Sequence, residues 1–172
     1  MPQSKVLIIK KETALTLFYF LIISGLAILA PIISFHQQAI TGPLVNALLF
    51  ISAIVLGTKL SILVALLPSL VALSVGLLPS VLAPMVPFIM FSNVLLIFTF
   101  DSLKQKSYWL AVILSALLKF IFLYSTSFLV TRLIIKKVLA QRISLMMSWP
   151  QLLTALAGGV LAYLFLKAIK RI

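Results

Sequence analysis

Long apolar stretches separated by short polar segments run through most of the chain. A helix needs roughly 20 apolar residues to cross the ~30 Å hydrocarbon core of a bilayer. One run is shorter than this, at residues 43–56, so we expect neighbouring helices to shield it or the bilayer to thin around it. The pattern predicts an all-α, polytopic bundle of six transmembrane helices that forms a single domain over residues 1–172. The six predicted helices lie approximately at residues 13–35, 43–56, 60–78, 84–100, 107–130 and 149–166.

Composition supports the membrane interpretation. Hydrophobic residues make up 63% of the 172 positions and charged residues only 9%, whereas soluble domains are about 45–50% apolar. The first apolar run is too long for the ~7–15-residue core of a signal peptide, so we expect a retained helix. These features predict a multi-pass protein of a prokaryotic inner or plasma membrane, in contact with lipid.

The basic residues predict an orientation. If six helices place both ends on one side, nine Lys and Arg residues fall on that side and four on the other. Cytoplasmic segments carry the excess of Lys and Arg, so both termini are predicted to be cytoplasmic. The four exceptions lie within residues 131–148, where apolar and basic residues alternate as in an interfacial helix. This stretch could be anchored to lipid phosphates, or it could attract an acidic substrate.

Small residues recur at helical spacing and predict close helix packing. The last run contains two small-xxx-small pairs, Ala155 with Gly159 and Gly158 with Ala162, a spacing that lets helix backbones approach. Within the third run, Pro68 predicts a kink. The third run also has small residues along one line of the helix, which are Ser61, Ala65, Ser69, Ala72 and Gly76.

Lys119, near the middle of the fifth run, is the most unusual residue in the chain. A lone cation at the centre of a bilayer costs at least ~2.5–3.5 kcal/mol, so it normally faces a wet or liganded cavity. The chain has only two acidic residues, Glu12 at the start of the first run and Asp101 just past the end of the fourth. Neither lies in the core of a span. A buried ammonium here either loses its proton or takes a negative charge from a bound molecule, and an anionic ligand is the first partner to expect.

Other polar residues lie at depths that agree with a pocket open to the outside. Each has an ordinary alternative: the asparagines could bond backbone carbonyls across helices, His36 could be a solvated loop residue, and Trp149 could belong to an interfacial aromatic belt. A pocket between bundled helices usually combines apolar walls with a few convergent polar groups. The predicted substrate-binding residues are Lys119, Asn46, Asn93, Tyr124, Trp149, Gln151, His36 and Gln38.

The sequence argues against several function classes. It has no cysteine, one histidine and two carboxylates, which leaves almost nothing for a metal cage or a catalytic acid–base pair. No phosphate-binding glycine loop is present, so the chain by itself is not an ATPase. The basic residues are scattered through short segments and do not form one polar face, which argues against nucleic acid. We therefore expect no enzyme activity, no catalytic residue, no metal and no cofactor.

Three short sequence runs resemble a known family and add to the interpretation as a membrane bundle with a pocket. The runs TGPLVN at 41–46, MSWPQ at 147–151 and TALAGG at 154–159, within six short hydrophobic helices, resemble the substrate-binding S component of energy-coupling factor (ECF) transporters. Similar sequences are sometimes labelled iron hydrogenase, but without cysteine the chain cannot hold an iron–sulfur cluster in the usual way. The resemblance implies capture of a vitamin-like molecule from outside. It also implies docking on a membrane coupling subunit driven by two ATPase subunits. The nearest match to the family's docking face on the first helix is Ala27, Ala30 and Ser34.

The main alternative comes from a different class of function. The chain could be a structural or assembly subunit of a larger membrane complex, in which Lys119 pairs with an acidic residue of a partner chain. A co-purified small anion would favour transport. Obligate co-purification with an acid-bearing membrane partner would favour assembly.

Overall fold

The computed structural model describes residues 2–33, 37–74, 76, 80–134 and 144–172, and every regular element in these ranges is helical. The all-α class predicted from the sequence is confirmed. Consecutive helices are joined by short connections such as the Leu56–Gly57 turn, where Gly57 adopts a positive φ of 76°. The elements are α1 (Pro2–Ile33), α2 (Gln38–Val55), α3 (Thr58–Ser74), η1 (Ser80–Met85), α4 (Val86–Leu103), α5 (Tyr108–Ile134) and α7 (Trp149–Ala168).

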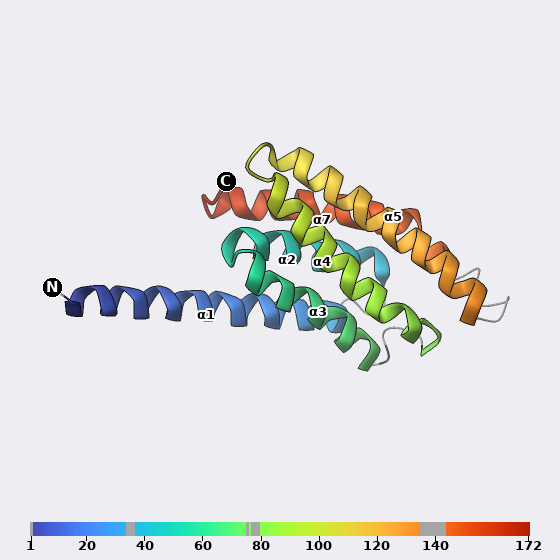
Figure 1. Ribbon diagram of the computed structural model, residues 1–172, viewed down its shortest axis with the longest axis horizontal. Coiled ribbons are helices and arrows are strands. Elements are labelled where there is room, and N and C mark those ends of the chain that lie inside the picture. Colours follow the sequence, from blue (N-terminus) through green and yellow to red (C-terminus); the bar gives the residue numbers. More distant parts are fainter. Residues whose placement is uncertain (1, 34–36, 75, 77–79, 135–143) are drawn as a thin grey trace.

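The long helices form one elongated bundle in which consecutive helices run back and forth (Figure 1). Both chain ends lie at the same end of the bundle, and the N-terminal part of α1 extends beyond the other helices. We call this the terminal end, and the opposite one the far end. The far end contains the start of α2, η1 and the start of α7.

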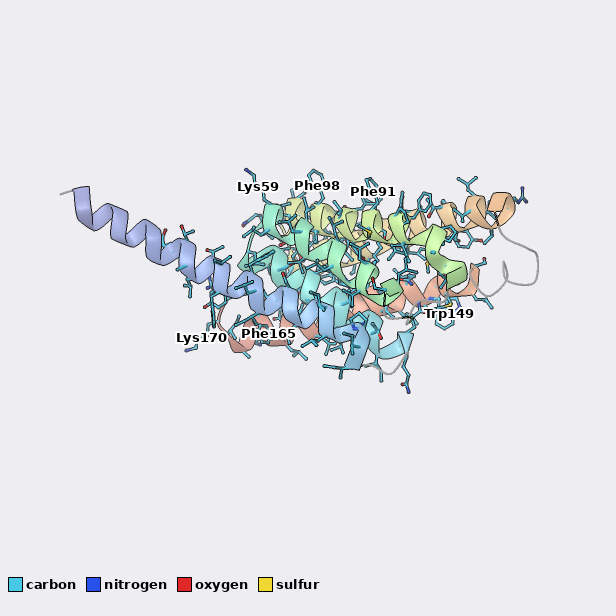
Figure 2. All side chains as sticks on the ribbon, turned by 90° about the horizontal axis from the view of Figure 1, so that it is seen from below. Lys59, Phe91, Phe98, Trp149, Phe165 and Lys170 are labelled. Carbon is cyan, nitrogen blue, oxygen red and sulfur yellow. The ribbon has the colours of Figure 1, made fainter. Side chains whose placement is uncertain are left out.

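Within the described ranges, five helical segments are long and apolar enough to cross a membrane: Glu12–Ile33, Gln38–Val55, Leu82–Leu103, Tyr108–Arg132 and Ser144–Ala168. The remaining long helix, α3, has 17 residues and is shorter than the others. Large apolar side chains such as Phe91 and Phe98 point outward from the bundle (Figure 2). These features suit a multi-pass protein in lipid.

Several helix boundaries differ from the sequence prediction, among them the start of α1 at Pro2, and two of the differences bear on the site. Helix α2 begins at Gln38, not near residue 43, because the Gln37 carbonyl accepts hydrogen bonds from the backbone N–H groups of Ile40 and Thr41. The helix therefore has 18 residues, enough to span, and the predicted short span is wrong. Helix α3 ends at Ser74 and not at residue 78. Gly76 consequently falls after the helix and is exposed, while the other four small residues of the predicted stripe are buried.

Helices α2 and α7 make the most extensive helix–helix contact in the described part of the chain, and the small residues of α7 predicted to pack closely lie in it. A Cβ added at Gly158 would lie 2.6 Å from the Cβ of Asn46 and 2.9 Å from the Ala47 nitrogen. A Cβ at Gly42 would lie 2.6 Å from Cγ2 of Thr154. Because glycines stand at both contacts, the two backbones approach closely enough to bring Asn46 deep into the bundle.

A polar cluster at the terminal end holds α2, α3 and α4 together. Asp101 forms an ion pair with Lys104 at 2.6 Å and accepts a hydrogen bond of 2.5 Å from the Thr58 hydroxyl. The Lys104 ammonium also donates to the Ala53 carbonyl at 2.9 Å. One of the two carboxylates of the chain is therefore already paired, far from the centre of the bundle.

Candidate functional site

The Lys119 side chain lies inside the bundle, with only 3% of its surface exposed. Its Nζ donates hydrogen bonds to Oδ1 of Asn46 on α2 and to Oδ1 of Asn93 on α4, each at 2.7 Å. These distances are in the range of charge-assisted N–H···O bonds. An ammonium has three N–H donors. Two are engaged by these amide oxygens, and among the described residues no acceptor for the third is found.

Both asparagines are held with their oxygens toward Lys119. Nδ2 of Asn46 donates to the Gly42 carbonyl at 2.9 Å, one turn earlier on α2. Nδ2 of Asn93 donates across helices to the Ala65 carbonyl of α3 at 3.2 Å. Rotating either amide by 180° would turn its NH₂ group toward the ammonium and would break the carbonyl bond. Asn93 therefore combines the two suggested roles, bonding a carbonyl of another helix and facing Lys119, whereas Asn46 faces Lys119 and bonds a carbonyl of its own helix.

A cavity of about 160 Å³ lies beside Lys119, toward the far end of the bundle. Its wall is mostly apolar, with a few polar groups that converge from different helices. This is the composition expected of a ligand pocket in a helix bundle. The lining residues are Pro31, Gln38, Thr41, Gly42, Val45, Asn46, Pro68, Ser69, Ala72, Leu82, Ile89, Asn93, Lys119, Met146, Met147 and Gln151.

Two glutamines and a backbone carbonyl organise the far end of the cavity. Nε2 of Gln38 on α2 and Nε2 of Gln151 on α7 both donate to the Met146 carbonyl at 3.1 Å. This shared acceptor holds the segment that precedes α7 against the start of α2. The neighbouring Met147 is buried and lines the cavity. Among the described residues, the far end of the cavity is therefore held by hydrogen bonds between side chains and backbone, with no charged group in the lining.

Lys119 is the only charged residue in the cavity lining of the described part of the chain. Asp101 lies eight residues after Asn93 on α4, about 12 Å further along the helix axis. Glu12 lies 19 residues before the lining residue Pro31 on α1, roughly 28 Å away along that axis. Neither acid lies close enough to neutralise Lys119, so a protonated Lys119 needs a counter-ion that enters the cavity.

The structure brings together five of the eight predicted site residues, Lys119, Asn46, Asn93, Gln38 and Gln151, around one cavity. Their role in binding stays a prediction. His36 lies outside the described residues, as do residues 135–143 of the predicted interfacial stretch. At the described edge of that stretch, the Arg132 guanidinium lies 4.1 Å from the centre of the Phe128 ring.

The predicted placement of Tyr124 and Trp149 at the pocket is wrong. Tyr124 follows Lys119 by five residues, which rotates it about 140° around the helix, and its side chain is 51% exposed. Trp149 precedes Gln151 by two residues, so it points to the opposite side of α7 and is 61% exposed (Figure 2). It lines a separate outer groove between α2 and α7. Shared depth in the bilayer did not imply a shared helix face.

The sequence pattern also missed several lining residues. Met146 and Met147 belong to the turn before α7, outside any predicted span, and no residue-type signal singled them out. Ser69 and Ala72 were interpreted only as packing positions, although they face the cavity as well. Small residues can leave space in a wall just as they allow close packing, and the sequence does not distinguish the two.

The described residues contain no group of three or more His, Cys, Asp or Glu side chains arranged to hold a metal ion. Comparison of the chain with protein-family models, with curated proteins and with solved structures finds no match. The functional argument therefore depends on the geometry of the cavity.

Proposed function

We propose that this chain is the substrate-binding membrane subunit, or S component, of an ECF-type importer, and that it captures a small anionic, vitamin-like molecule from outside. One observation supports this most strongly: a buried ammonium, without a counter-ion, facing a cavity inside a membrane bundle. Such a cation is costly unless a ligand or water compensates it. Ligand binding explains why a cation is buried at this position, whereas helix packing alone does not.

The position of the cavity is consistent with uptake. Apart from Lys119, the basic residues whose side chains are described are Lys59, Lys104, Lys106, Lys167, Lys170 and Arg171, in segments at the terminal end, and Arg132, in the last turn of α5 toward the far end. Figure 2 shows Lys59 and Lys170 at the opposite end from Trp149. Under the positive-inside rule this bias favours a cytoplasmic terminal end and an external far end. The cavity would then receive its ligand from outside.

An importer built on this chain needs partners that supply energy, because the sequence has no phosphate-binding glycine loop. The proposal assigns that role to a membrane coupling subunit and two ATPase subunits. The expected docking face does not fit. Ala27 and Ala30 are 0% and 7% exposed and pack in the bundle's own core, and Ser34 lies outside the described residues. A coupling subunit would have to meet a different surface.

The alternative, an assembly subunit that pairs Lys119 with a partner's acid, is less well supported by the geometry. With 3% of its surface exposed, Lys119 is not on the outer face where another membrane helix would pack. A partner carboxylate would have to enter the cavity between α2, α4 and α5. A small free anion can reach the same place without separating the helices.

Mass spectrometry of small molecules released from the purified protein tests the proposal. The parent chain is compared with Lys119→Met, which keeps most of the stem and removes the charge, and with Lys106→Met, the same change at an exposed lysine. We expect one small anion to be enriched in the parent and Lys106→Met samples and lost from Lys119→Met. Obligate co-purification of an acid-bearing membrane protein, with no small anion, would replace this proposal with the assembly role.

A further inference from the structure

We infer that the cavity selects a compact monoanion, a carboxylic acid with one apolar ring or short branched chain, over dianions and over neutral molecules of the same shape. This inference rests on the proposed binding function and specifies its ligand class. It follows from three features of the cavity: its charge count, the donors left at Lys119, and the volume and chemistry of its wall.

The charge count sets the ligand charge. The lining has one cation and no acid, so one negative charge makes the occupied cavity neutral. The nearest basic residue further along α5, Arg132, lies 13 residues from Lys119, about 20 Å along the axis. Among the described residues, a second negative charge would therefore find no partner in the cavity, and burying it so is strongly unfavourable in a low-dielectric interior. A neutral ligand would leave the ammonium unpaired.

The hydrogen bonds at Lys119 set the head group. Two of its three N–H donors are held by the oxygens of Asn46 and Asn93, so one donor remains for a ligand. Each asparagine Nδ2 has two N–H groups, and the structure engages one of them with a backbone carbonyl. This local supply of donors suits the two oxygens of a carboxylate. A phosphate monoester has three terminal oxygens and close to two negative charges, so it needs more hydrogen-bond donors and more cations than line the cavity among the described residues.

The wall and the volume of the cavity indicate the size and polarity of the part of the ligand beyond its carboxylate. Lys119, Asn46 and Asn93 form a polar triad in the cavity. Beyond this polar triad, the lining is apolar at Val45, Pro68, Leu82, Ile89 and Met147. Methionine sulfur and aliphatic groups pack well against an aromatic ring. The cavity volume of about 160 Å³ is close to the ~150 Å³ of an engineered cavity that binds benzene. A single ring or a short branched chain fills this volume.

Four probes built on one benzene ring separate these requirements, and two of them, benzoate and benzamide, have nearly the same shape. Benzoate is the monoanion, benzamide its neutral analogue, and phenyl phosphate and phthalate supply a second negative charge. Each is titrated into the purified full chain in lipid nanodiscs, with affinity measured by calorimetry and by the ligand-induced rise in unfolding temperature. We expect benzoate to bind at least tenfold more tightly than the other three. Lys119→Met should lower benzoate affinity by ~10- to 150-fold, the effect of losing one charge-assisted hydrogen bond, and should abolish the preference over benzamide.

The outcomes are distinct. Equal binding of benzoate and benzamide, tighter binding of phenyl phosphate or phthalate, or no benzoate binding up to millimolar concentration would each overturn the inference. If Lys119→Met does not remain folded, Asn46→Asp replaces it, because a neighbouring carboxylate neutralises Lys119 and should remove the benzoate preference. Selective benzoate binding by a chain that supports no uptake would retain this inference and refute the importer. Uptake of a dianion would support the importer and overturn this inference.

Discussion

Lys119 on α5 and Asn93 on α4 are joined by a 2.7 Å hydrogen bond, and the same asparagine donates to the Ala65 carbonyl on α3. One amide therefore connects three helices at the floor of the cavity and fixes the direction of the only charge there. Any ligand that accepts a hydrogen bond from Lys119 also affects the contacts among these helices.

Replacing Asn93 by Asp tests the charge balance directly. The new carboxylate has nearly the shape of the amide and supplies Lys119 with an internal counter-ion, but it loses the hydrogen bond that Nδ2 donates to the Ala65 carbonyl. Thermal unfolding therefore checks that the variant is folded. We expect benzoate affinity to fall by about 1.5–3 kcal/mol, or ~10- to 150-fold, because the ligand must now compete with a fixed negative charge. Calorimetry of benzoate and benzamide binding measures this change in affinity. Unchanged benzoate affinity in a folded Asn93→Asp protein would contradict the role assigned to Lys119.

Gly158→Ala tests the close approach of α2 and α7. The added Cβ would meet the Cβ of Asn46 at 2.6 Å and two backbone atoms at 2.9 Å. Overpacking of this kind costs typically ~1–3 kcal/mol, and here it also displaces Asn46 from Lys119. We expect lower stability to thermal unfolding in nanodiscs and weaker benzoate binding.

Gly25→Ala on α1 is the matched control for that substitution. A Cβ at Gly25 meets nothing within 4 Å, and alanine favours the helix by up to ~1 kcal/mol over glycine. Stability should be unchanged or slightly higher. Equal destabilisation by the two substitutions would mean that the effect comes from glycine content and not from the α2–α7 contact.

Ala72→Phe tests whether the cavity itself holds the ligand. Ala72 lines the cavity from α3 without touching the polar triad's hydrogen bonds, so a phenyl ring there should occupy the binding volume. We expect benzoate binding to be lost while the protein stays folded. Trp149→Ala removes a larger side chain that faces outward, and it should leave affinity unchanged. The opposite pattern would move the binding site to the groove beside Trp149.

Single-cysteine labelling tests the orientation, and the absence of native cysteine removes any background. Ala39→Cys places an exposed thiol at the far end, and Gln105→Cys places one in the exposed α4–α5 turn near the terminal end. A membrane-impermeant maleimide added to intact cells should label Ala39→Cys alone. Labelling of Gln105→Cys in intact cells would reverse the orientation and would leave the cavity open to the cytoplasm.

The sequence by itself determined the class of fold and singled out Lys119 as an unusual residue. Apolar runs of bilayer length permit little except helices, since backbone groups in lipid must pair within their own segment. A lysine in mid-run with no nearby acid is unusual in any arrangement of those helices. The small-residue spacing of α7 likewise predicted a close contact, because glycine and alanine place no bulk between backbones.

Only the tertiary structure decided which residues meet at the site. Asn46 and Asn93 lie 73 and 26 residues from Lys119, and their convergence depends on the crossing of α2, α4 and α5. Depth along a span can be read from position in the run, but the direction of a side chain relative to other helices cannot. For that reason Tyr124 and Trp149 were placed at the pocket by depth and proved to face outward. Met147, whose hydrophobicity gave no signal, lines the wall because a turn folds over the far end of the cavity.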